Sequence, residues 1–393
     1  MRKLTTALGL PQHRFASIHV VGTNGKSSVT RMTAALLGAH GLRTGACVSP
    51  HADRWSQRTL VEGEEVGPEA WARAVEQVAR AAEGVNRTLE EGEAVTQFEA
   101  ATAASFVALA DARVEVAVVE AGLGGRIDAT NTIPSKVTVL TSIGLDHTEW
   151  LGETEVEIAA EKLAVLRDHT KLVLGEVSPQ VLALAMKIAA ERNAEILRGP
   201  GDRGLPTRAP GAFQRRNFAT ACAAAEAFLG EELGWELKER VAATVTVPGR
   251  LEQLAEQPPI FVDAAHNPDG AAALAESLPA IAAGRRVIAC LAVLADKDAG
   301  AMIAALAPAL ERVVCTELPA AALEGHGRPG ARSRPAAELA AICGKIGLAA
   351  EVEPSFEAAL RQGRARAAAG PEGLLLITGS HYAIAPARAV VAS

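Results

Sequence analysis

The chain has 393 residues, a net charge of −7 and five scattered cysteines. The length predicts two or three domains, and the acidic balance argues against nucleic acid as the main partner. The cysteines are odd in number and form no C-x-x-C pair, so we expect neither a disulfide framework nor a zinc site. No apolar stretch resembles a secretion signal or a membrane span. We therefore expect a cytoplasmic protein without a membrane partner.

β-Branched runs alternate with alanine-rich helical stretches in the first part of the chain, which predicts an α/β fold. Near-continuous apolar runs such as 114–122 and 136–144 are typical of parallel strands that are buried on both faces. A segment rich in Gly, Pro and Arg, 198–213, predicts a loop. We expect strands at 17–22, 43–49, 114–122, 136–144 and 171–177, and helices at 27–41, 68–83, 94–110, 153–166, 179–192, 214–229 and 235–244.

A second alternating set begins after the turn signal Pro248-Gly249. It predicts a smaller α/β unit, with domains at residues 1–247 and 248–393. Ligands of open α/β sheets bind outside the carboxyl ends of the strands, so residues that follow strands are the candidate site residues. In this unit we expect strands at 259–263, 286–294, 312–316, 349–353 and 373–378, and helices at 269–282, 298–310, 335–346 and 355–368.

The segment HVVGTNGKSSVTRM, residues 19–32, lies between a predicted strand and a predicted helix. Its sequence GKS fits the end of the phosphate-binding pattern G-x-x-x-x-G-K-[ST], but Val20 stands where that pattern begins with glycine. In such a loop, backbone N–H groups surround a phosphate, Lys26 reaches the outer phosphates and the Ser27 hydroxyl ligates Mg²⁺. The alternative is a glycine turn beside an exposed lysine.

Three more polar residues of the first unit follow predicted strands. Glu120 ends a strand in VVEAGLGGRIDATN, His147 follows a strand in SIGLDHTEW, and Ser49 lies in SPH. A strand-end carboxylate suits a magnesium–nucleotide site, and a histidine there suits metal binding or proton transfer. The alternatives are a surface glutamate, a helix-capping histidine and a simple turn.

Three polar clusters follow strands of the second unit. IFVDAAHNPDG contains Asp263 and His266, LADKD contains Lys297, and ITGSHY contains Ser380 and His381. Strand ends of one sheet face the same edge, which favours a shared site over three unrelated loops.

The segments GTNGKS, SPH, FE, VEAGLGGRIDATN, TSIGLDHTEWLG, PGR, DAAHNPDG, ADKD and TGS follow one another through nearly the whole chain. This ordered set resembles the folylpolyglutamate synthase/dihydrofolate synthase family of the Mur ligase superfamily. The resemblance implies an N-terminal P-loop NTPase-like domain of the Mur ligase central type and a smaller C-terminal Rossmann-like α/β domain. It also accounts for Val20, because Mur-type ligases carry the shorter loop G-T-x-G-K-[ST].

The resemblance implies an ATP-dependent amide ligase that adds L-glutamate to dihydropteroate, to reduced folate or to both. It implies an acyl-phosphate intermediate, the products ADP and phosphate, two Mg²⁺ ions and a monomer. LDHTEWLG favours the bifunctional members.

The family's site residues transfer to matching positions of this chain. Lys162, in EKLAV, matches a lysine that CO₂ carbamylates, although Leu-Ala replaces the family's Ala-Gly after it. The implied catalytic residues are Lys26, His147 and Lys162. The implied Mg²⁺ ligands are Ser27, Ser49, Glu120 and His147. The implied ATP-binding residues are Gly22, Thr23, Asn24, Gly25, Lys26, Ser27, Asn217, Arg250, Asp263 and His266. Lys297, Ser380 and His381 match positions around the glutamate or phosphate site.

Two departures and two rivals qualify this interpretation. Gln57-Arg58 replaces the family's Glu-Arg after SPH, which puts substrate contacts in doubt, and 198–213 is short for the family. Another Mur-type amide ligase, such as a peptidoglycan enzyme, needs a nucleotide-sugar domain before the loop, and the segment before Gly22 is too short for one. A non-catalytic P-loop switch does not need the second unit's strand-end clusters.

Overall fold

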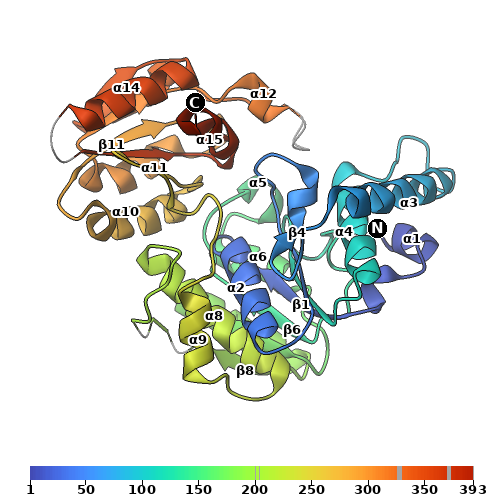
Figure 1. The fold of residues 1–393 in the computed structure, drawn as a ribbon. Helices are drawn as coiled ribbons and strands as arrows, with labels where there is room; N and C mark the ends of the chain where they lie inside the picture. Colours follow the sequence, from blue (N-terminus) through green and yellow to red (C-terminus); the bar gives the residue numbers. More distant parts are fainter. Residues whose placement is uncertain (200, 203, 325–329, 370–372, 393) are drawn as a thin grey trace. The chain divides into compact units, whose positions relative to one another are not determined.

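The computed structural model describes residues 1–393 except 200, 203, 325–329, 370–372 and 393 (Figure 1). The chain forms two units, each an α/β body on its own sheet, as predicted. The division into domains at residues 247 and 248 stays a prediction. The first unit comprises Met1–Arg208 and Gln214–Val245, and the second comprises Ala209–Phe213 and Thr246–Ser393.

Among the described residues, the first unit has an eight-stranded sheet in the order β4-β3-β2-β5-β1-β6-β7-β8. The strands from β2 to β8 in this order are parallel, and β3 and β4 pair antiparallel at one edge. The central strands β5 and β6 are buried along their whole length, as their apolar runs predicted. The strands are β1 Ala16–Val21, β2 Thr44–Cys47, β3 Thr59–Val61, β4 Glu64–Glu65, β5 Val116–Glu120, β6 Val137–Leu140, β7 Lys171–Leu174 and β8 Glu195–Arg198.

The helices of the first unit pack their apolar faces in separate clusters. Helices α1, α3 and α4 pack together beside the sheet (Figure 1), while α6 and α7 pack against β6 and β7. The helices are α1 Arg2–Ala7, α2 Lys26–Ala39, α3 Pro68–Asn86, α4 Gln97–Asp111, α5 Thr148–Leu151, α6 Glu155–Leu163, α7 Pro179–Glu191, α8 Ala212–Leu229 (in this unit from Gln214 onward) and α9 Trp235–Ala242, with short 3₁₀ turns at Pro11–His13 and Trp55–Arg58.

The second unit has a sheet in the order β13-β12-β11-β14-β10-β9, in which β9 alone runs antiparallel among the described strands. The fully buried strand β14 lies between β11 and β10. The elements are β9 Glu252–Glu256, β10 Pro259–Val262, β11 Arg286–Leu291, β12 Arg312–Cys315, β13 Ala349–Val352, β14 Gly373–Thr378, α10 Pro268–Ala282, α11 Ala299–Leu306, α12 Ala320–Leu323, α13 Ala336–Lys345, α14 Phe356–Ala368 and α15 Ile384–Ala392, with 3₁₀ turns at Ala307–Ala309 and His381–Ala383.

The structure confirms each predicted helix and strand and shifts some of their ends. The strand predicted at 43–49 stops at Cys47, because the Ser49 N–H leaves the ladder and donates to the Glu120 carboxylate. The helix predicted at 298–310 stops at Leu306, and a 3₁₀ turn that contains Pro308 follows it. Residues 200 and 203 of the predicted loop 198–213 lie outside the described residues.

Several short elements were not predicted from the sequence. The hairpin of β3 and β4 turns at Glu62 and Gly63, both with positive φ, and its strands are too short for a visible alternation. Strands β8 and β9 and helices α1, α5, α12 and α15 were not predicted either. All five cysteines are buried and free. Within the described residues, every helix is too short or too polar to cross a lipid bilayer.

Candidate active site

The loop between β1 and α2 is clamped by the segment that follows β6. Thr23 N donates to Ser142 O at 2.7 Å, and Thr141 Oγ1 donates to Asn24 O at 2.6 Å. A Cβ on Gly22 would lie 1.9 Å from Thr141 Oγ1, so this position accepts glycine alone. The neighbouring strand therefore preorganises the loop.

The end of the loop leaves the N-terminus of α2 open to an anion. Gly25 caps the helix with φ 84° and has no side chain to satisfy the first N–H groups. A Cβ on Gly25 would lie 2.5 Å from Asn217 Oδ1, which places this α8 side chain directly beside the loop. Lys26 Nζ donates back to Thr23 O at 3.0 Å. The loop, Lys26 and Asn217 are thus brought together as predicted for one binding site.

Glu120, at the carboxyl end of β5, joins the ends of two other elements. Its carboxylate is buried, with 3% exposed. Oε1 accepts from Ser27 Oγ at 3.0 Å, and Oε2 accepts from Ser49 N at 3.0 Å. Three of the four residues predicted as metal ligands are therefore joined here, Ser27 through its hydroxyl and Ser49 through its backbone N–H.

This oxygen set fits Mg²⁺ and does not fit a soft metal. The part of the chain that the structure describes contains no group of three or more His, Cys, Asp or Glu that could hold a metal ion. Mg²⁺ often takes only one or two carboxylates and completes its shell with phosphate and water oxygens. A carboxylate flanked by two serines beside a phosphate loop matches that preference.

His147, the fourth predicted ligand, lies in the loop that follows β6. It precedes α5 in a left-handed conformation, with φ 53°. Asp146 Oδ1 accepts from the His147 backbone N–H at 2.9 Å and lies 3.8 Å from its Nε2. The aspartate thus fixes this turn and lies close enough to attract a protonated imidazole.

Lys162, near the end of α6, is a buried amine with 5% exposed. Burial, followed by the charge of Lys26, lowers the pKa of Lys162 to about 7, against the opposing effect of Asp146, Asp128 and Glu161. A Lys162 amine that is substantially neutral near pH 7 is able to act as a nucleophile.

The glycine-rich loop after Glu120 is held against α6. A Cβ on Gly125 would lie 2.6 Å from the Glu161 carbonyl oxygen and 2.7 Å from that of Lys162. The Glu161 carboxylate also accepts from Arg126 N at 3.0 Å. Gly125 therefore lets the loop backbone approach α6 more closely than a residue with a side chain could.

A buried hydrogen-bond chain that the sequence analysis missed fixes the start of this loop. Asp128 Oδ2 accepts from Gly122 N at 3.0 Å and Leu123 N at 2.9 Å, and its Oδ1 accepts from Thr130 Oγ1. Thr130 Oγ1 lies 2.8 Å from His19 Nε2. Since the hydroxyl proton goes to Asp128, His19 donates to the threonine and stays neutral. Burial, followed by the charge of Arg167, lowers the pKa of His19 to about 3.

The SPH loop is a packed structure in which Arg58 is central. Arg58 Nε donates to His51 Nδ1 at 2.9 Å, and its guanidinium lies 4.3 Å from the centre of the Trp55 ring and 5.7 Å from that of Phe98. Gln57 Oε1 accepts from the backbone N–H groups of residues 52, 53 and 54. Gln57, the departure from the family pattern, therefore shapes the loop through its side-chain carbonyl.

Exposed apolar side chains lie in the segments that follow β5 and β6. Ile127 is 91% exposed, Trp150, on α5, is 72% exposed, and Leu123 and Leu145 are also exposed. They were not predicted as site residues, although apolar residues within polar motifs were a visible signal.

In the second unit, Asp263 directly follows β10 and shapes the backbone around it. Its Oδ2 accepts from Leu251 N and its Oδ1 from Ala265 N, both at 2.8 Å. Burial raises the pKa of Asp263, while the charge of Arg250 opposes the rise. His266 Nδ1 lies 2.9 Å from Ala264 O and donates to it. Arg250, Asp263 and His266 are thus gathered at the end of one strand.

The remaining predicted residues of this unit follow β11 and β14, the strands next in order to β10. Ser380 is buried and caps the turn that contains His381 by accepting from Tyr382 N at 3.3 Å. Lys297 is buried, with Nζ 3.9 Å from Asp296 Oδ2. The structure thus confirms that all three clusters lie at the carboxyl edge of one sheet.

The comparisons with known proteins agree with this geometry. Residues 20–197 match the model of the Mur ligase middle domain, and residues 249–381 match that of the Mur ligase glutamate ligase domain. The chain is 36% identical, over 80% of its length and 72% of the relative, to the dihydrofolate synthase/folylpolyglutamate synthase of Mycobacterium tuberculosis. It is 29% identical to the Escherichia coli enzyme of that name, over 95% of the chain and 86% of the relative.

Solved structures of similar proteins extend the match to the whole fold. The M. tuberculosis folylpolyglutamate synthase complexed with ADP superimposes with a TM-score of 0.90 at 32% identity, over 100% of this chain and 94% of that chain. The E. coli FolC protein in complex with DHPP and ADP gives a TM-score of 0.85 at 28% identity, over 99% of this chain and 92% of that chain.

The phosphate loop, the strand-end carboxylate and the two matched domains define a Mur-type, ATP-dependent ligase. Within this class, the chain belongs to the dihydrofolate synthase/folylpolyglutamate synthase family. The family resemblance, the fold and the enzyme class predicted from the sequence are confirmed.

Proposed function

We propose that the chain joins the amino group of L-glutamate to a carboxylate of dihydropteroate, of a reduced folate or of both, at the expense of ATP. The observation that carries this proposal is the buried Glu120 carboxylate, which accepts from Ser27 Oγ at the start of α2. A carboxylate oxygen beside the phosphate loop supports a metal–nucleotide site there. Relatives with the same fold are named for these reactions, and solved neighbours hold ADP and DHPP.

The chemistry needs ATP because a carboxylate is a poor acyl donor. Transfer of the γ-phosphoryl group to the carboxylate gives an acyl phosphate, and the glutamate amine then displaces phosphate to form the amide. The two anions that must first meet repel each other. Lys26 and the backbone N–H groups of the loop offset this repulsion and stabilise charge on the transferring group.

Ser27, Ser49, Glu120 and His147 are the proposed magnesium ligands, and the proposed number of ions is two. A bound Mg²⁺ supplies charge neutralisation between phosphate oxygens. A solved Yersinia pestis relative holds AMPPNP and a Mn ion, which supports a divalent cation in this fold.

Lys162 is the proposed site of carbamylation. Its amine attacks the carbon of CO₂, loses one proton and becomes a carbamate anion. The lowered pKa of Lys162, about 7, supports this step because attack requires the neutral amine. The carbamate then replaces a cation near Lys26 with an anion, which favours binding of Mg²⁺. His147, held by Asp146, is the proposed group that accepts a proton from the glutamate ammonium.

The exposed apolar residues of the loops after β5 and β6 support a flat aromatic substrate. Leu123, Ile127, Leu145 and Trp150 offer apolar surface close in sequence to Glu120 and His147. A pterin and its aminobenzoate ring provide a matching apolar body.

Asn217, Arg250, Asp263 and His266 are proposed to bind ATP, and Lys297, Ser380 and His381 to bind glutamate or phosphate. The support is the position of each residue at a strand end or beside the loop. We also propose activity on both dihydropteroate and reduced folate, a monomeric protein and no nucleic-acid partner.

The test is ADP release by the purified chain with ATP and Mg²⁺, with L-glutamate and dihydropteroate or tetrahydrofolate added singly and together. The proposal expects rapid ADP release only when both substrates are present, with one amide formed per ADP. A P-loop switch would instead release ADP at the same rate with or without them. Another Mur-type ligase would respond to neither pteroate nor folate.

A further inference from the structure

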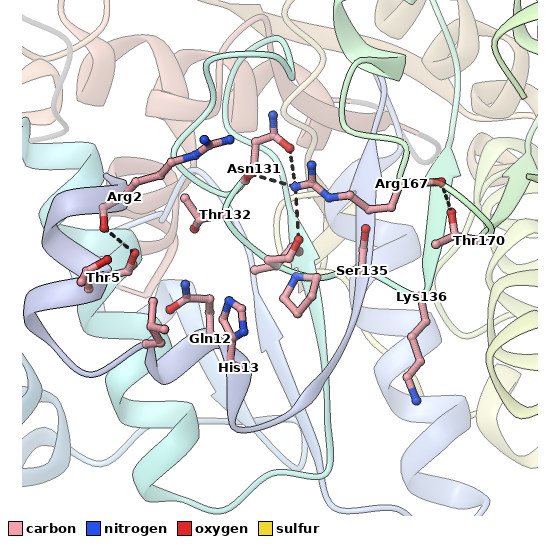
Figure 2. A pocket seen from close by; sticks show the side chains of 14 residues that line it. Arg2, Thr5, Gln12, His13, Asn131, Thr132, Ser135, Lys136, Arg167 and Thr170 are labelled. Atoms are coloured by element: carbon pink, nitrogen blue, oxygen red, sulfur yellow. Dashed lines mark hydrogen bonds between the residues drawn. The ribbon is translucent and has the colours of Figure 1, made fainter. Parts of the chain in front are cut away.

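A pocket of about 670 Å³ lies in the first unit at the edge where strands β1, β6 and β7 begin. Its walls come from α1, from residues 10–13 before β1, from residues 131–136 before β6 and from residues 167 and 170 after α6 (Figure 2). The phosphate loop follows the other end of β1, six residues away, so the two sites are about 20 Å apart. The volume suits a small organic molecule.

The charge of this pocket has one sign. Arg2, His13, Lys136 and Arg167 are among its lining residues, and none of the 14 is an aspartate or a glutamate. Lys136 turns away, with Nζ 5.7 Å from the centre of the Phe228 ring. Burial, followed by the like charges of Arg2 and Arg192, lowers the pKa of Arg167. The arginines therefore lie near other cations, and no lining carboxylate offsets their charge. A bound anion would reduce the repulsion between these like charges.

Hydrogen bonds hold Arg167 in a fixed position at this wall. Its Nη2 donates to Asn131 O at 2.8 Å, to Asn131 Oδ1 at 2.7 Å and to Ile133 O at 3.2 Å (Figure 2). Among the described residues, its Nη1 and Nε have no hydrogen-bond partner. The bonds made by Nη2 hold the guanidinium in place at this wall, and the N–H groups of Nη1 and Nε remain as donors for an anion.

Two buried polar groups at the same pocket lack partners within the described part of the chain. They are Gln12 Oε1 and Ser135 Oγ, and both residues are only 2% exposed. Both atoms are closed off from solvent, so they lie behind the wall of the pocket, and a molecule in the pocket does not contact them.

From these observations we infer a second, anion-binding site at Arg2 and Arg167. Its ligand is a small organic molecule that carries a phosphate or carboxylate group. The site is separate from the ligase site and does not depend on the proposed function.

The experiment is isothermal titration of the full chain carrying Lys26→Ala, which weakens anion binding at the phosphate loop. Pyrophosphate and citrate are the two probes. The test variant adds Arg2→Glu, an exposed change at the pocket. The matched control adds Arg364→Glu, the same change at an exposed position on α14 of the second unit. Circular dichroism verifies that both variants are folded.

We expect at least one probe to bind the Lys26→Ala protein. Arg2→Glu should weaken that binding about tenfold, because reversing one charge near an anion costs on the order of 1.4 kcal/mol or more, and Arg364→Glu should leave it unchanged. The tighter probe identifies phosphate or carboxylate as the preferred group. Absence of binding by both probes up to about 10 mM, or equal affinities of the Arg2→Glu and Arg364→Glu proteins, would overturn the inference.

Discussion

Glu120 and Asp263 are both carboxylates at the end of a buried parallel strand, each 3% exposed, yet they are held differently. Glu120 accepts from the Ser27 hydroxyl and from one backbone N–H, whereas Asp263 accepts from two backbone N–H groups. A hydroxyl rotates away at little cost when a cation arrives, but a backbone amide moves only if the strand end moves. The difference supports the proposal that Glu120 exchanges its serine for a cation, and it predicts that Asp263, besides its proposed contact with ATP, holds the backbone around it in place.

The largest effect is expected at the loop beside Glu120. Lys26→Ala removes the charge that is proposed to face the outer phosphates, so we expect kcat/KM to fall about a thousandfold or more. The measurement is substrate-dependent ADP release. Lys187→Ala, an exposed lysine on α7, is the matched control and should retain full activity. Substantial turnover by the Lys26→Ala protein would show that the loop does not take part in the reaction.

Glu120→Gln tests the exchangeable carboxylate directly. The amide keeps the size and one acceptor, but it loses the charge that is proposed to hold a cation. We expect activity to fall about a hundredfold, with a shift to higher Mg²⁺ requirement and little change in Tm. A large loss of Tm with an unchanged Mg²⁺ dependence would show that Glu120 is a framework group like Asp263.

The protonation state of Lys162 predicts how the activity depends on pH. Below about pH 7 its amine is protonated and cannot take up CO₂, whereas above that pH it is neutral. Activity should therefore rise as the pH increases through about 7, and it should depend on added bicarbonate in CO₂-depleted buffer. Lys162→Ala should lower activity and abolish both dependences, with partial recovery on addition of a short carboxylate such as acetate. Full activity of Lys162→Ala would refute carbamylation.

We expect Asp263→Asn to affect stability more than activity, whereas Glu120→Gln should affect activity more than stability. The amide nitrogen faces a backbone N–H, either that of Leu251 or that of Ala265, and one accepted hydrogen bond is lost. We expect a loss of about 1–3 kcal/mol in the free energy of unfolding, with a smaller loss of activity than Glu120→Gln. Denaturant unfolding of the two variants side by side measures this. Equal stability of the two proteins would contradict the difference in role that we expect between Glu120 and Asp263.

The smallest effect on activity is expected at His19. Its pKa is about 3 in the folded chain and 6.5 when unfolded, so between these values the unfolded chain binds more protons. The natural chain should therefore lose stability as the pH falls from 6.5 towards 3. His19→Gln keeps a donor for Thr130 and cannot titrate, so its unfolding free energy should fall less over this window. Identical pH profiles would contradict a neutral buried histidine.

The sequence predicted what depends on local pattern. The α/β alternation, the loop at Lys26 and the strand-end position of Glu120 follow from periodicity and from residues adjacent in the chain. The links that make the site depend on partners far apart, such as Gly25 beside Asn217 or His19 bonded to Thr130, and no local pattern encodes them. The lowered pKa of Lys162 arises from burial, which a sequence without coordinates does not show. The pocket at Arg167 was not predicted from the sequence for the same reason, because its cationic residues come from separate segments of the chain.

The central claim is that the phosphate held by this loop passes to a substrate carboxylate. The most direct test uses dihydropteroate or folate with ¹⁸O in the reacting carboxylate, together with ATP, Mg²⁺ and L-glutamate, and mass analysis of the released phosphate. Transfer through an acyl phosphate predicts one ¹⁸O atom in each phosphate released. Unlabelled phosphate, with amide formation undiminished, would contradict the account.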